Sequence, residues 1–172
     1  MNGSALFFYF MVYSFAGWVL EHAYSGWNAG RLKGEGFLRG PFKPMYGIAI
    51  VLLLIGKQAG LSPITMIVLA FFVPSIVEYI SGMMLDKLFH RRYWDYTNNR
   101  YQLHGYVCLK FSLYWLLLSL GVLSVIHPVV VGWYNGLAPV WQRIELLVLL
   151  YLLADLGAAV YSRKVKRTAD AA

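Results

Sequence analysis

Three acidic side chains, Glu21, Glu78 and Asp155, lie within or at the ends of long apolar segments. A carboxylate at the middle of a membrane helix costs roughly 2.5–3.5 kcal/mol, so such a group usually faces a bundle interior or a water-filled cavity. At a helix rise of about 1.5 Å per residue, Glu78 and Asp155 both lie roughly 12–13 Å before the next basic residue. The three acids therefore predict one shared polar site in the cytosolic half of a membrane helix bundle.

The composition supports a membrane location. Of the 172 residues, 59% are hydrophobic and only 13% are charged. The runs Met1 to Leu20, Gln58 to Val77 and Phe111 to Gln142 carry no Lys, Arg, Asp or Glu, and each is long enough to cross the hydrocarbon. Because these runs are continuously apolar, an all-α polytopic bundle is predicted and a barrel of alternating strands is excluded.

Windows of membrane length predict about five transmembrane helices in a single integral membrane domain, 1–172, at 4–22, 44–62, 64–86, 108–127 and 144–162, with a basic tail at 163–172. Of the 15 Lys and Arg residues, all except Lys57 and Arg143 then fall on one side. Since basic residues favour the cytosolic side, the N-terminus is predicted outside and the C-terminus in the cytosol of a bacterial cell.

Two segments are ambiguous. In the second predicted helix only Pro44 to Gly56 is uncharged, so this helix either crosses or is re-entrant. His127-Pro128 is predicted to break the fourth helix, and 129–140 to lie along the outer interface.

Two polar loops are predicted to cover the cytosolic end. The first is rich in glycine and proline, which can expose backbone N–H groups to an anion beside Arg39 and Lys43, or can form an ordinary border loop; its turn-forming residues are Gly40, Pro41, Pro44 and Gly47. The second, 90–105, ends at Gly105 and is dense in aromatic side chains. There Trp94, Asp95 and Tyr96 either face the site or form an interfacial belt with Asp95 capping a turn.

A divalent cation is a further hypothesis. Oxygen and imidazole ligands would come from Glu21, His22, Glu78, Asp95, His104 and Asp155, although their spacing matches no metal motif and no cofactor is certain. The chain contains no Gly-x-x-x-x-Gly-Lys-Ser/Thr phosphate loop. Any ATP-driven process would need a nucleotide site on another chain.

Several motifs in order along the chain resemble a bacterial membrane family, the putative ABC-transporter type IV or CmpB-like permeases. They are Gly17-Trp18 with Glu21, the segments 36–41 and 44–47, Glu78 before 85–89, Trp94-Asp95-Tyr96, Gly105 with Cys108-Leu109 and Ser112, His127-Pro128, and Asp155. The resemblance spans most of the chain and implies a multi-pass membrane protein with a transport role.

The leading hypothesis is a transport component that moves a small solute, ion or lipid, with Glu21, Arg39, Glu78, Trp94, Asp95, Tyr96 and Asp155 as binding or gating residues. Its predicted partners are anionic lipid headgroups together with a second copy, another membrane subunit or a separate ATPase. Nucleic acid is excluded, because the basic residues follow the membrane borders and form no soluble module. The alternatives are an enzyme or flippase acting on a phosphorylated lipid or isoprenoid, and a noncatalytic scaffold in which the acids only pair helices.

Overall fold

The computed structural model describes residues 1–29 and 36–170, with helices α1 (Gly3–Ala29), α2 (Pro44–Gln58), α3 (Pro63–Phe89), α4 (Leu109–Gly121) and α5 (His127–Asp170). The strands β1 (Gln102–Leu103) and β2 (Val107–Cys108) pair antiparallel in one small hairpin. The predicted all-α helical bundle is therefore confirmed.

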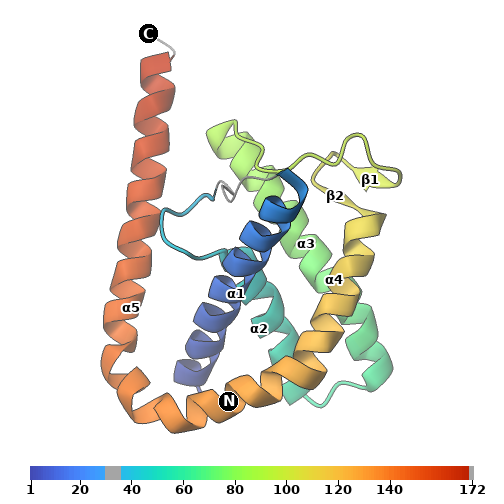
Figure 1. Ribbon diagram of the computed structural model, residues 1–172, viewed down its shortest axis with the longest axis vertical. Coiled ribbons are helices and arrows are strands. Elements are labelled where there is room, and N and C mark those ends of the chain that lie inside the picture. The colour runs from blue at the N-terminus through green and yellow to red at the C-terminus, as the bar shows by residue number, and fades with distance from the viewer. Residues whose placement is uncertain (30–35, 171–172) are drawn as a thin grey trace.

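The helices pack in chain order, α1 on α2, α2 on α3 and α3 on α4, while α5 lies against α1 (Figure 1). Small residues bring α1 and α2 together. A Cβ added at Gly47 would collide with Ser14 and Phe10 of α1, and one added at Gly17 would overlap the ring of Tyr46. Such close backbone approach is typical of helix packing in membranes, where side-chain volume at the interface limits contact.

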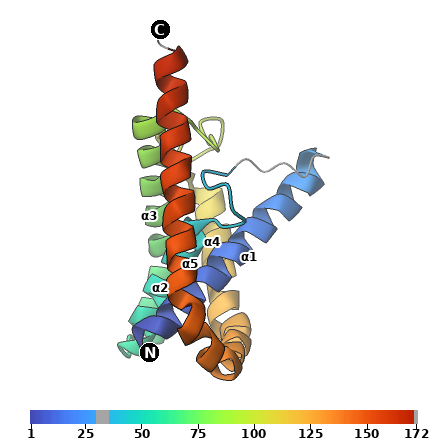
Figure 2. The ribbon, with the colours of Figure 1, turned by 90° about the vertical axis from the view of Figure 1, so that its left-hand side faces the viewer.

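Within the described residues, three helical stretches are long and apolar enough to cross a membrane, namely Gly3–Gly26, Pro63–Phe89 and Leu109–Lys164. The count of five crossings is not confirmed, because α2 has only 15 residues. At about 1.5 Å per residue it is roughly 22 Å long, less than the ~30 Å of hydrocarbon. The segment 36–43 that leads into α2 lies below the upper ends of α3 and α5 in both views, so α2 begins inside the bundle (Figures 1 and 2).

The predicted break of the helix at His127-Pro128 is wrong. Residues Leu109 to Asp170 are helical without interruption, with a π-helical turn at Val122–Ile126. The first part of α5 runs along the base of the bundle before this helix turns upwards (Figure 1). Pro128 has no N–H to donate to Leu123 O, the π-helical partner five residues earlier. Lys57 Nζ donates to that carbonyl instead, at 3.3 Å, so the proline is tolerated within the helix.

The N-terminus and the α2–α3 connection lie at one end of the bundle, and the hairpin and the C-terminus at the other (Figure 1). The second predicted loop, 90–105, and the described part of the tail therefore share an end, as the charge distribution predicts. Arg31 and Lys33 of the first loop, and the last two residues of the predicted tail 163–172, lie outside the described residues. The orientation of these ends relative to the cytosol stays a prediction.

Candidate functional site

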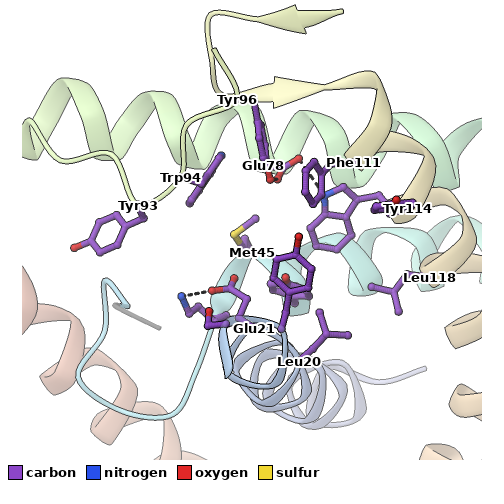
Figure 3. Close-up of a pocket in the computed structure, with 15 residues that line it drawn as sticks. Leu20, Glu21, Met45, Glu78, Tyr93, Trp94, Tyr96, Phe111, Tyr114 and Leu118 are labelled. Carbon is purple, nitrogen blue, oxygen red and sulfur yellow. Dashed lines mark hydrogen bonds and ion pairs between the residues drawn. The ribbon is translucent and has the colours of Figure 1, made fainter. Parts of the chain in front are cut away.

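A cavity of about 480 Å³ lies between α1, α2, α3 and α4, beneath the segment 93–96 (Figure 3). Its charged side chains are Glu21, Lys43 and Glu78. Aromatic rings make up much of the remaining wall: Tyr24, Tyr46, Tyr93, Trp94, Tyr96, Phe111, Tyr114 and Trp115. The cavity thus combines a few charges with a large aromatic surface.

Glu78, on α3, is only 4% exposed. Its Oε1 accepts a hydrogen bond from the Tyr96 hydroxyl at 3.0 Å, and its Oε2 accepts one from Trp115 Nε1 at 3.0 Å. Both donors are neutral, and Glu78 forms no ion pair with another described residue. One carboxylate therefore links α3, the loop and α4, and no cation among the described residues pairs with it.

Tyr96 is held in place for this donation. Its ring stacks on Phe111 with centroids 4.7 Å apart. Burial, together with the nearby Glu78 carboxylate, raises the pKa of Tyr96 far above its usual range. The hydroxyl consequently stays protonated and remains a donor across the physiological pH range.

On the opposite wall, Lys43 and Glu21 form an ion pair with Nζ and Oε2 2.5 Å apart. The Tyr46 hydroxyl interacts with the same Glu21 carboxylate, and the Tyr46 ring packs on Trp115 with centroids 4.8 Å apart. The side chain of Tyr46 fits against α1 only because residue 17 is a glycine. Glu21 is thus neutralised locally, in contrast to Glu78.

The roof of the cavity is a compact turn. Trp94 Nε1 donates to Tyr106 O at 2.8 Å, and the Tyr106 hydroxyl donates to Asp86 at 2.7 Å. Asp95 is exposed and accepts hydrogen bonds from the Thr97 hydroxyl and backbone N–H, which together with Arg92 lower the pKa of Asp95. Asp95 therefore caps the turn, one of the two predicted arrangements, and is not among the residues that line the cavity.

Gly105 makes this turn sterically feasible. Its φ is +75°, and a Cβ there would collide with Asp95 and Thr97. Glycine adopts positive φ without the steric penalty that a side chain imposes. The predicted loop-forming role of Gly105 thus has a physical basis.

Asp155 lies outside the cavity lining and is 8% exposed. Its two carboxylate oxygens accept hydrogen bonds from the backbone N–H groups of Arg39 and Gly40, at 3.1 and 2.9 Å. The Arg39 side chain is exposed, and the residue meets Asp155 through its backbone. Because non-helical backbone inside a bundle needs partners for its polar groups, Asp155 stabilises the segment that leads into α2.

Arg163, near the described end of α5, connects both polar loops. It donates to the Tyr93 hydroxyl at 3.0 Å and to Gly36 O at 3.1 Å, and its guanidinium lies 4.5 Å from the centre of the Phe37 ring. The roof of the cavity and the segment 36–43 are therefore attached to the same helix.

A family model described as putative ABC-transporter type IV matches residues 8–160. The chain belongs to this putative ABC-transporter type IV family. No curated protein and no solved structure matches the chain significantly. The matched range contains every residue that lines the cavity. Membership supports a membrane protein with a transport role.

The predicted metal ligands of this ABC-transporter family member do not come together. In the part of the chain that the structure describes, no group of three or more His, Cys, Asp and Glu side chains could hold a metal ion. His22 Nδ1 lies 2.8 Å from Trp18 O, and His104 Nδ1 lies 2.9 Å from the Tyr79 hydroxyl. Both imidazoles thus have local hydrogen-bond partners.

Four of the predicted site residues, Glu21, Glu78, Trp94 and Tyr96, line one cavity, whereas Arg39, Asp95 and Asp155 lie elsewhere. Tyr46 and Trp115 also line the cavity but were not predicted as site residues. A usable signal for Trp115 was present, since an indole N–H inside an uncharged membrane run needs a buried acceptor, and few side chains in these segments provide one.

Proposed function

We propose that the chain is the membrane-embedded component of a transporter and that its cavity binds a small organic cation. The observation that carries the proposal is the position of Glu78. Its carboxylate is buried in an aromatic wall, and its only described hydrogen-bond donors, Tyr96 and Trp115, are neutral. A cationic ligand would supply the missing opposite charge.

The aromatic rings favour an organic cation over a bare metal ion. Aromatic faces attract ammonium groups within about 6 Å, and the attraction increases when water is excluded. The Tyr46–Trp115 and Tyr96–Phe111 pairs line the cavity, and one ring of each pair donates a hydrogen bond to Glu78. The volume of about 480 Å³ is within the usual range for small-molecule sites.

The Glu21–Lys43 pair extends the range of ligands to zwitterions. Lys43 lies in the same cavity as Glu78 and belongs to the segment whose backbone Asp155 holds. An anionic group on the ligand would compete with Glu21 for Lys43 while the ammonium group faces Glu78. We therefore propose this pair as the gating contact.

Movement through the membrane would require other chains. The sequence contains no phosphate loop, so a separate ATPase would supply the energy. With three candidate spans, a second copy or another membrane subunit would complete the pathway. We propose a bacterial inner-membrane location with the hairpin facing the cytosol.

The test is equilibrium binding of tetramethylammonium to the purified protein. Glu78→Gln keeps the shape of the side chain but removes the charge, and we expect it to weaken binding at least tenfold, about 1.4 kcal/mol. The matched control is Glu145→Gln, which alters a carboxylate hydrogen-bonded to Ser4. Equal affinity in the wild type and Glu78→Gln would disprove the proposed site.

A further inference from the structure

The cavity opens sideways between two helices. Its rim includes Leu20 and Tyr24 of α1 and Tyr114 of α4, which are 43%, 57% and 53% exposed. The main packing partners of α1 are α2 and α5, and the partner of α4 is α3. Figure 2 shows α1 leaning away from α4 towards its C-terminal end.

This opening would face lipid. Leu20 lies within the candidate span Gly3–Gly26, and Tyr114 lies within the helix Leu109–Lys164, whose apolar window qualifies as a span. The outward surface of α4 around the rim is also apolar, with Leu113 and Leu117 47% and 68% exposed. A molecule entering between α1 and α4 would therefore come from the bilayer rather than from water.

The lining becomes apolar with increasing distance from the hairpin along α4. Trp115 contacts the Glu78 carboxylate, and Leu118, also part of the lining, lies one helical turn further from the hairpin end. On α1, the apolar Leu20 precedes Glu21. An ammonium group beside Glu78 would thus have an apolar exit at about its own level or slightly deeper, where an alkyl chain could extend into the bilayer.

We infer that the ligand is an amphiphile, a quaternary ammonium headgroup on an alkyl chain, that enters the cavity laterally between α1 and α4. This inference rests on the proposed function, because the headgroup occupies the site assigned there to an organic cation. It adds the attached chain and the route of entry. Polar residues on two walls with apolar residues at the mouth are the arrangement that such a molecule requires.

The test uses the full chain in nanodiscs of phosphatidylethanolamine and phosphatidylglycerol, which contain no quaternary ammonium group. The probe is dodecyltrimethylammonium with a photoactivatable group at the end of its chain. We expect labelled peptides from α1 and α4 at the rim, and at least a tenfold loss of that labelling in Glu78→Gln or when excess unlabelled dodecyltrimethylammonium is present.

Two variants at the mouth separate entry from folding. Leu118→Trp fills the apolar exit and should reduce rim labelling at least tenfold. Leu117→Trp changes a neighbouring side chain that does not line the cavity, and it should leave both rim labelling and tetramethylammonium binding unchanged. If Leu118→Trp does not fold, Leu20→Trp tests the same exit from α1.

The outcomes distinguish the two proposals. Tetramethylammonium binding that depends on Glu78, combined with labelling spread evenly over the lipid-facing helices, would overturn the amphiphile and leave the cation site intact. Failure of both probes to bind in a Glu78-dependent way would overturn both. A dodecylphosphocholine probe that labels the rim more strongly than the cationic one would identify a zwitterionic lipid headgroup as the source of the ammonium group.

Discussion

Glu78 and Asp155 are two buried carboxylates in different regions of the bundle, and their partners differ in kind. Asp155 accepts from two backbone N–H groups of one loop, while Glu78 accepts from two side chains on separate elements that line a cavity. In the first arrangement both carboxylate oxygens accept hydrogen bonds from the backbone. The second places the carboxylate at the wall of an open space.

The difference shows how the same functional group, a buried carboxylate, can serve structure or binding. The N–H groups of Arg39 and Gly40 lie inside the bundle and have no helical partner, so they require Asp155 as their acceptor. Asp155 is therefore not available to bind a ligand. Tyr96 and Trp115 could each be satisfied by water in the cavity, so Glu78 is not required for the fold in the same way.

The largest effect is expected for Asp155→Ala. The substitution leaves two backbone N–H groups without an acceptor, each costing about 1–3 kcal/mol, so the free energy of unfolding should fall by roughly 2–6 kcal/mol. Denaturant unfolding of the purified protein measures it. Asp155→Asn, which keeps one acceptor oxygen, should lose less. A decrease below about 1 kcal/mol for the alanine variant would contradict a structural role.

Gly40→Ala probes the same contact from the loop. A Cβ there would press on the Tyr151 hydroxyl and Asp155 Oδ2, and overpacking of this kind costs about 1–3 kcal/mol. Gly157→Ala, also on α5 but with open space around its Cβ, is the control and should be neutral or slightly stabilising because alanine favours helix. Equal thermal stability of the two variants would argue against close packing at residue 40.

Glu78→Gln should have a smaller effect on stability, about 1 kcal/mol or less, because the amide oxygen still accepts one of the two hydrogen bonds. This small loss should accompany the weakened cation binding described above. Thermal unfolding in the absence of ligand provides the measurement. A loss as large as that of Asp155→Ala would mean that both carboxylates are structural.

The smallest effect is expected for the exposed Asp95. Its pKa is lowered chiefly by hydrogen bonds from Thr97, so its contribution to the hairpin is present above the unfolded pKa of about 3.9 and is lost as the pH falls through the lower folded value. Hydrogen exchange of the Tyr96 amide, which donates to Gly105 O at 2.9 Å, should accelerate relative to its intrinsic rate over that range. Asp95→Asn should remove this acid dependence, and an unchanged profile would contradict it.

The predicted starts of the first four helices lie within one residue of the observed ones, whereas the fifth helix was predicted to start at 144 and α5 begins at His127. Pro44 and Pro63 both stand at the first helical turn, and Ser62 accepts from the Thr65 N–H at 3.2 Å as a helix cap. The continuity of the helix through Pro128 could not be predicted in this way, because it depends on Lys57 reaching Leu123 O from another helix. A carbonyl that is satisfied by a side chain from another helix cannot be recognised from the sequence around the proline.

The site shows the same limit. Glu78, Trp94 and Tyr96 could be identified from the sequence because a charged group within an apolar segment is costly, and because aromatic groups gather in the adjoining loop. The partner Trp115 was missed because it lies in an otherwise apolar run. Asp155 is separated from the cavity because the segment with Arg39 and Gly40 contacts it. The sequence does not show which loop lies next to which helix.

The sequence by itself determined the helical membrane class, the positions of the costly carboxylates and the family, because all three follow from composition, hydropathy and the order of motifs. Only the tertiary structure decided which carboxylate binds backbone and which lines a cavity. The physical reason is that a hydrogen bond requires its donor and acceptor about 3 Å apart, and for Glu78 and Asp155 the donors come from segments far away in the chain.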